Sequence, residues 1–239
     1  MNLNCVSKIA AALLMLGMTV LPANAGGERA FDFSKDTGGR ETREFVPLVG
    51  IWHADRDGAR TVYAADGRNW EQGLMAPGAR EKARELFGDR HAEFIAGLEN
   101  YRYFPLSVCR GIKTFRNGSI ELSFKAAEGR IDQAAGIAFN IRPNGNYLVV
   151  RANALENNLV LFGMAEGRRS SLAWVRNVPT PSNRWHTLKV VVSGKRIEAY
   201  LNGTRYIDTT WREEIDGRIG LWSKADSYTL FGSLTVTPQ

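Results

Sequence analysis

Residues 185–203 read WHTLKVVVSGKRIEAYLNG, and this stretch decides the fold. Leu188, Val190 and Val192 alternate with residues that face outward, which is the period of a strand with one buried face. A glycine at 194 marks a turn, and the pair Asn202-Gly203 supplies the positive φ angles that tight turns need. The stretch therefore predicts two successive strands, each followed by a turn.

The same alternation recurs upstream of this stretch. Apolar residues occupy every second position in three further segments, namely Ile120, Leu122, Phe124; Ile137, Phe139, Ile141; and Leu148, Val150, Ala152. Turn pairs of the Asn-Gly type stand at 117–118 and 144–145. Many strands with regular turns and no βαβ rhythm predict an all-β protein, either a β-sandwich or a jelly roll.

A helical pattern interrupts the strands between residues 78 and 100. After Pro77-Gly78, apolar residues recur at helical spacing among charged ones; they are Ala83, Leu86, Phe87, Phe94, Ile95 and Leu98. A glycine at 88 breaks the pattern near its middle. We expect a short helical insertion packed on a single sandwich domain that spans residues 26–239.

The first 25 residues resemble a secretory signal peptide. Lys8 precedes an apolar run from residue 9 to residue 21, and the small-residue triplet Ala23-Asn24-Ala25 follows it. We expect cleavage near Ala25 and export to the periplasm or the medium. Removal of the leader takes Cys5 with it and leaves Cys109 alone, so no internal disulfide is expected.

The charge distribution argues against nucleic acid as a partner. The sequence has 31 Lys and Arg against 25 Asp and Glu, a formal net charge of +6, and the basic residues are scattered among acidic ones. Such a pattern is typical of a solvated surface. No stretch after the leader is apolar enough to span a membrane, and the sequence does not indicate an oligomeric state.

Polar residues gather on the strand face opposite the aliphatic core. The candidate ligand-binding residues are Asn140, Arg142, Tyr147, Arg151, Asn153, Glu156, Asn157, Trp222, Lys224 and Asp226. Aromatic rings cover the apolar faces of sugar rings, and planar polar groups hydrogen-bond the hydroxyls. The face could therefore bind a carbohydrate, with Trp222 stacking on the sugar. It could equally be an ordinary wet sheet face, in which Arg151 and Lys224 pair with Glu156 and Asp226 as structure.

Two of these carboxylates are candidates for catalysis. Arg151 and Glu156 either clamp each other across a turn or point together into a groove, where a carboxylate beside a guanidinium would suit acid/base chemistry. Asp226, close to Lys224, has the same ambiguity. We therefore keep Glu156 and Asp226 as candidate catalytic residues.

The stretch at 185–203, together with Gly217-Arg218-Ile219-Gly220-Leu221-Trp222, resembles the C-terminal half of laminin G-like and concanavalin A-like jelly rolls. The chain is similar in particular to the bacterial exported 3-keto-disaccharide hydrolase-like group, over roughly residues 105–239. This resemblance implies a curved sheet with a glycan on its concave face. The fold hosts many functions, so the resemblance alone does not select one.

The polar face suggests a glycan-binding domain. The resemblance adds two alternatives, a hydrolase of a modified disaccharide and a laminin G-like interaction domain with an exposed apolar stripe on residues 79–99. The Glu-x-Asp-x-x-Glu signature of glucanases is absent. The three histidines have no metal-ligand spacing. Residues 53–58 faintly resemble a calcium loop but lack its later glutamate, and no other cofactor is indicated.

Overall fold

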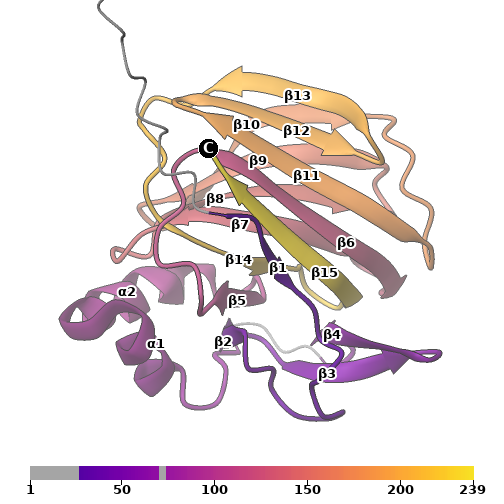
Figure 1. Ribbon diagram of the computed structural model, residues 1–239, viewed down its shortest axis with the longest axis horizontal. Helices are drawn as coiled ribbons and strands as arrows, with labels where there is room; N and C mark the ends of the chain where they lie inside the picture. The colour runs from indigo at the N-terminus through magenta and orange to yellow at the C-terminus, as the bar shows by residue number, and fades with distance from the viewer. Residues whose placement is uncertain (1–26, 70–73) are drawn as a thin grey trace, which may run out of the picture.

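The computed structural model describes residues 27–69 and 74–239, so the expected leader lies outside the described residues. Two antiparallel sheets pack face to face (Figure 1). The eight-stranded sheet has the order β13-β12-β11-β6-β15-β4-β3, with β1 paired to β15, and the seven-stranded sheet has the order β10-β9-β8-β7-β14-β5-β2.

The strands of the eight-stranded sheet are β1 (Arg29–Phe31), β3 (Trp52–Asp57), β4 (Arg60–Asp66), β6 (Gly118–Glu128), β11 (Trp185–Ser193), β12 (Arg196–Leu201), β13 (Thr204–Thr210) and β15 (Tyr228–Pro238). Those of the seven-stranded sheet are β2 (Phe45–Val49), β5 (Leu106–Cys109), β7 (Ala134–Ile141), β8 (Tyr147–Asn153), β9 (Asn158–Ala165), β10 (Arg168–Arg176) and β14 (Arg218–Trp222). The helices are α1 (Ala79–Phe87), η1 (Gly88–Arg90), α2 (His91–Leu98) and η2 (Glu99–Tyr101).

The apolar alternations of the sequence form the core between the two sheets. Leu122 of β6, Phe139 of β7 and Leu188 of β11 are fully buried in one cluster with their strand neighbours at every second position. Burial of such side chains is the main favourable contribution to folding. The predicted all-β sandwich is confirmed.

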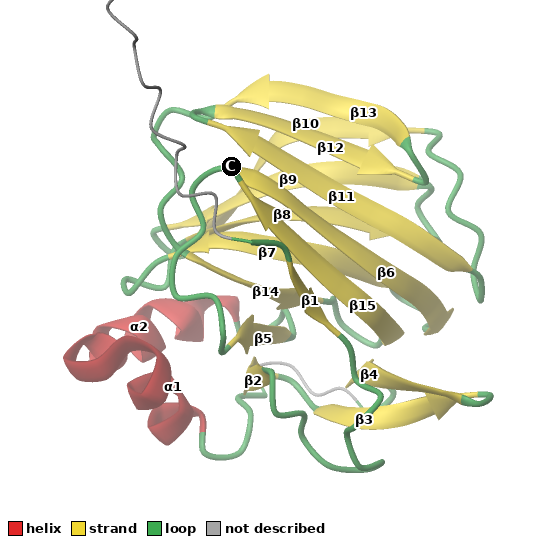
Figure 2. Cartoon of the chain, viewed as in Figure 1, coloured by secondary structure: helices red, strands yellow, loops and turns green. Residues whose placement is uncertain are grey.

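The helical insertion covers part of the outer face of the seven-stranded sheet, meaning the face directed away from this core. Leu86, Phe94 and Leu98 pack there against sheet residues that include Tyr147 and Val149. Figure 2 shows both helices together at one side of the sandwich, where α1 contacts β2. The expected exposed stripe on residues 79–99 is wrong, because its large apolar side chains are the ones that hold the insertion on the sheet.

The backbone of the helical insertion packs directly against the backbone of the β7–β8 turn. A Cβ atom added to Gly97 of α2 would lie 2.1 Å from the carbonyl oxygen of Asn144. Such a distance excludes any side chain. The glycine therefore fixes how closely the insertion docks, and that docking decides which part of the outer face stays open.

Cys109 is a free, buried thiol of β5. Burial raises its pKa to about 11, so the thiol is protonated and unreactive at neutral pH.

Among the described residues, no helix has the length and apolar character needed to cross a membrane.

Candidate functional site

The predicted site residues divide between the two ends of the outer face. Residues 140, 142 and 147 lie at the end where β7 leads into β8, whereas Arg151, Asn153 and Glu156 lie at the other end of β8. Tyr147 and Arg151 are four residues apart on one strand, a separation of roughly 13 Å. A single sugar ring therefore cannot touch both groups.

A network of alternating charges occupies the Arg151 end. We call it the charge network; it consists of Asp132, Arg151, Asn153, Glu156, Asn158 and Lys224. Asp132 Oδ1 accepts hydrogen bonds from Lys224 Nζ at 2.9 Å and Asn153 Nδ2 at 2.8 Å. Glu156 Oε2 accepts from Arg151 Nη1 at 3.1 Å. The second carboxylate oxygen of Glu156 lies 3.8 Å from Lys224 Nζ and joins the two halves.

The charge network is buried on one side and open on the other. Asp132 and Arg151 are each 1 % exposed, whereas the side chains of Glu156 and Lys224 are 35 % and 15 % exposed. Arg151 Nε and Asp132 Oδ2 are buried and have no hydrogen-bond partner among the described residues. Since both atoms lie on the buried side of the network, its accessible hydrogen-bonding groups are those of Glu156 and Lys224.

The electrostatics keep Glu156 ionised. Burial alone would raise the pKa of Glu156, but the Asn158 amide and the Arg151 guanidinium outweigh it and hold the pKa below its ordinary value. Burial also lowers the pKa of Arg151, and the Glu156 carboxylate opposes this shift. Glu156 is therefore a hydrogen-bond acceptor or a base at neutral pH, and not an acid.

The carboxylate of Asp226 is engaged by backbone N–H groups. It accepts backbone N–H hydrogen bonds from Arg130 at 2.7 Å, Ile131 at 3.0 Å and Asp132 at 2.9 Å. Lys224 pairs with Asp132 and not with Asp226. The carboxylate of Asp226 therefore holds the loop that positions Asp132, and the expectation of a catalytic base there loses its support.

This carboxylate should make the protein acid-sensitive. Burial opposes the shift, but the three N–H groups hold the pKa of Asp226 below its ordinary value of 3.8. A lowered folded-state pKa adds stability above the unfolded value, and this stability is lost as pH falls through the folded value. We expect the unfolding free energy of Asp226→Asn, measured by urea denaturation, to fall less between neutral pH and pH 3 than that of the wild type. Parallel curves would contradict this role.

Trp222 is not a platform for a ligand. Its side chain is fully buried, and its ring stacks on Phe104 with the centroids 5.3 Å apart. The indole Nε1 donates to the Tyr147 hydroxyl at 3.3 Å, and Tyr147 is itself 2 % exposed. The expectation that Trp222 stacks on a sugar is wrong, because the segment that follows η2 covers its ring.

The exposed aromatic side chain of this face is Trp174 of β10, which is 48 % exposed. It pairs across the sheet with Val160, which in turn pairs with Arg151, so Trp174 lies two strands from the charge network in the same row. Sequence analysis missed it because a bulge between Ser171 and Ala173 breaks the alternation of β10. The alternation of Ala173, Trp174, Val175 and Arg176 after the bulge was the available signal.

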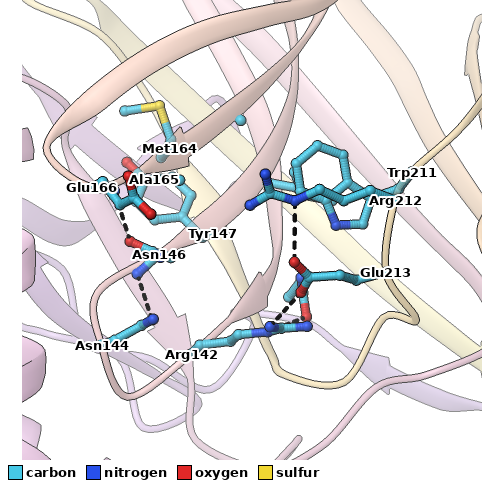
Figure 3. Close-up of a pocket in the computed structure, with 13 residues that line it drawn as sticks. Arg142, Asn144, Asn146, Tyr147, Met164, Ala165, Glu166, Trp211, Arg212 and Glu213 are labelled. Carbon is cyan, nitrogen blue, oxygen red and sulfur yellow. Dashed lines mark hydrogen bonds and ion pairs between the residues drawn. The ribbon is translucent and has the colours of Figure 1, made fainter.

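A hollow of about 230 Å³ lies at the other end of the face (Figure 3). We call it the amide hollow; its lining includes Asn140, Arg142, Asn144, Asn146, Tyr147, Glu166, Trp211, Arg212 and Glu213. Three connections meet there, those between β7 and β8, between β9 and β10, and between β13 and β14.

Asn157, the remaining predicted site residue, belongs neither to the charge network nor to the amide hollow. It lies in the exposed β8–β9 turn with φ of 46°.

The faint calcium loop is a strand. Residues 53–57 belong to β3, where Asp57 accepts hydrogen bonds from Lys125 and from the indole of Trp185. In residues 27–69 and 74–239, no group of three or more His, Cys, Asp or Glu side chains is placed to hold a metal ion.

Comparison with known proteins identifies the class of fold. No family model and no curated protein matches this chain. A carbohydrate binding module, CBM66 from Bacillus subtilis, superposes with a TM-score of 0.56 at 15% identity, covering 85% of this chain and 98% of that one. A β-glucanase from Bacillus licheniformis has a TM-score of 0.52 at 12% identity, covering 90% and 99%.

A lichenase from a mouse hindgut metagenome, a β-1,3-1,4-glucanase, has a TM-score of 0.55 at 8% identity and covers 89% of this chain and all of that one (100%). The chain therefore has the concanavalin A-like jelly-roll fold, as its resemblance implied. Identities this low establish the fold and not the function. The narrower likeness to 3-keto-disaccharide hydrolase-like domains stays a prediction.

Proposed function

We propose that this protein is a non-catalytic glycan-binding domain, which holds a sugar on the open part of the outer face between Trp174 and the charge network. The observation that carries the proposal is the exposed indole of Trp174 in the same sheet row as Arg151, whose ion-pair partner Glu156 is open to solvent. An indole can cover the apolar face of a pyranose, while a carboxylate accepts from its hydroxyls and an ammonium donates to them.

The fold comparisons support a sugar-related role of this kind. One of the similar structures is a carbohydrate binding module and two others are glucanases. Binding and hydrolysis of sugars thus both occur on this scaffold, so the choice between them has to come from the side chains.

The carboxylates favour binding over hydrolysis. Glycoside hydrolysis by the usual route needs two carboxyl groups that both reach the glycosidic bond, one of them as an acid. At the Arg151 end Asp132 is 1 % exposed, and Asp226 is held by three backbone N–H groups. Glu156 is the most exposed of the three carboxylates, and its lowered pKa makes it a poor acid.

Hydrolysis of a 3-keto disaccharide is a second candidate because it can start with a single base. A ketone acidifies the neighbouring C–H, and Glu156 is an ionised, partly exposed carboxylate beside Lys224 and Arg151. In this alternative Glu156 removes that proton and Lys224 stabilises the enolate oxygen. The enolate then expels the oxygen of the second sugar from the next carbon, that oxygen takes the proton back from Glu156, and water adds to the double bond left behind. The leader at residues 1–25 supports a further proposal that the protein acts after export.

A screen of residues 26–239 against a glycan array, with a parallel assay for sugar degradation, separates the two candidates. We expect binding without turnover. Glu156→Gln should weaken binding by about tenfold, because it replaces a charge-assisted acceptor by a neutral amide. The matched control is Glu121→Gln on the outer face of the other sheet, which should bind as the wild type does. Turnover that disappears in Glu156→Gln would instead establish the hydrolase.

A further inference from the structure

We infer that the amide hollow is a second binding site, separate from the charge network, which takes a neutral polyhydroxylated ligand such as a single sugar ring. It lies at the opposite end of β8 from Arg151 and shares no residue with the surface proposed above. The inference therefore does not depend on the proposed function.

The wall of the hollow is held rigidly by Arg142. Its Nε donates to Asn140 Oδ1 at 3.2 Å, its Nη1 to Glu213 Oε2 at 2.7 Å, and its Nη2 to the Glu214 carbonyl at 3.2 Å. These contacts tie the end of β7 to the β13–β14 connection. Figure 3 shows Arg142, Glu213 and Arg212 in one continuous chain of interactions along this wall. A preformed wall lowers the entropic cost of binding.

Asn140 is held in an uncommon conformation within this wall. Its φ is 52°, and it is 5 % exposed. Its Oδ1 also accepts from the backbone N–H of Asp216 at 3.0 Å. Asparagine tolerates the left-handed region better than most residues, and other asparagines of this chain adopt it too, so the hydrogen bonds distinguish Asn140. The conformation and the two hydrogen bonds together fix the side-chain amide of Asn140.

Several polar groups of the hollow remain available to a ligand. The oxygens of Asn140, Asn144 and Asn146 accept protein hydrogen bonds, but their Nδ2 groups make none to any described residue. The carboxylate of Glu166 and the two Nη groups of Arg212 likewise make no hydrogen bond within the part of the chain that the structure describes. The hollow therefore offers several donors and one uncommitted carboxylate.

The charges and hydrogen-bonding groups of the amide hollow indicate which class of ligand it binds. The formal charges of Arg142 and Arg212 cancel those of Glu166 and Glu213, so the site favours a neutral molecule. Hydroxyl groups accept from amides and donate to a carboxylate, which a purely anionic ligand cannot do. Trp211, which is partly exposed, adds apolar surface to the lining. A volume of about 230 Å³ is below that of pockets for drug-sized ligands and suits one ring.

The test is a titration of isotope-labelled protein, residues 26–239, with methyl glycosides of glucose, galactose and mannose, and with glucuronate as the charged comparator. NMR follows the side-chain amide signals of the three asparagines. We expect at least one neutral glycoside to shift these signals and to bind more tightly than glucuronate. Asn140→Asp keeps the accepting oxygen and tolerates the left-handed backbone, but it removes a donor, and it should weaken this binding about tenfold.

Asn183→Asp, at an exposed left-handed asparagine outside the hollow, should bind like the wild type. If Asn140→Asp does not fold, Asn146→Asp makes the same exchange of a donor. Three results would overturn the inference. They are no shift in any of the asparagine signals, tighter binding of glucuronate than of the neutral glycosides, and unchanged affinity in a folded aspartate variant. Shifts confined to the Trp174 indole would support only the surface at the other end of the sheet.

Discussion

Replacing Trp222 by alanine is expected to lower the free energy of unfolding by about 3–5 kcal/mol, the range for large buried aromatics. The indole is fully buried and stacks on Phe104. A Cβ atom added to Gly136 would lie only 3.3 Å from this ring, so the sheet packs closely beneath it and would collapse little into the space left behind. Urea denaturation with circular dichroism measures the loss.

Trp174→Ala is the matched control for this prediction, since it makes the same chemical change at a side chain that is 48 % exposed. Its cost to stability should be far smaller, because less apolar area is returned to water. Equal losses in the two variants, or a loss below about 1 kcal/mol for Trp222→Ala, would contradict the structural role of Trp222.

Arg151→Ala is expected to destabilise the protein by about 3 kcal/mol or more, the usual cost of breaking a buried ion pair from one side. The variant leaves Glu156 Oε2 without its guanidinium partner, and it leaves the buried Asn158 Oδ1 without the donor that lies 2.7 Å away. The remaining charges of the network lose the balance that makes their burial tolerable. Thermal and urea unfolding both measure this effect.

The comparison for Arg151 is Arg196→Ala on β12. Arg196 also pairs with two carboxylates, Glu198 and Asp208, but its side chain is 51 % exposed. Exposed ion pairs are screened by water and contribute little, so this variant should unfold close to the wild type. Similar losses for the two arginines would show that Arg151 is not buried as described.

Both predictions show where sequence reasoning succeeded and where it stopped. The alternation in β6, β7, β8 and β11 identified the core correctly, because a strand with one buried face repeats every two residues. Alternation also showed that Tyr147 and Trp222 point away from this core. It did not show that a second layer covers them, since the packing of the helical insertion on the sheet is a tertiary property.

The pairing of side chains in the charge network could not be predicted from the sequence either. Lys224 was expected near Asp226, two residues along the chain, but it pairs with Asp132, which is 92 residues away. Asp226 instead caps the loop that carries Asp132. Pairings at such sequence distance follow from strand order, with β14 beside β7, and neither spacing nor charge pattern indicates that order. Mutating Arg151 or Trp222 to test binding would therefore mostly measure unfolding.

The most direct test of the proposed function is the affinity of Trp174→Ala for the glycan that the array identifies, measured by isothermal titration beside the wild type. Ile51→Ala, at a residue that is 40 % exposed in the connection between β2 and β3, is the control. We predict that Trp174→Ala binds at least about tenfold more weakly while its unfolding free energy stays near that of the wild type. Wild-type affinity in Trp174→Ala would contradict the account and place the glycan elsewhere.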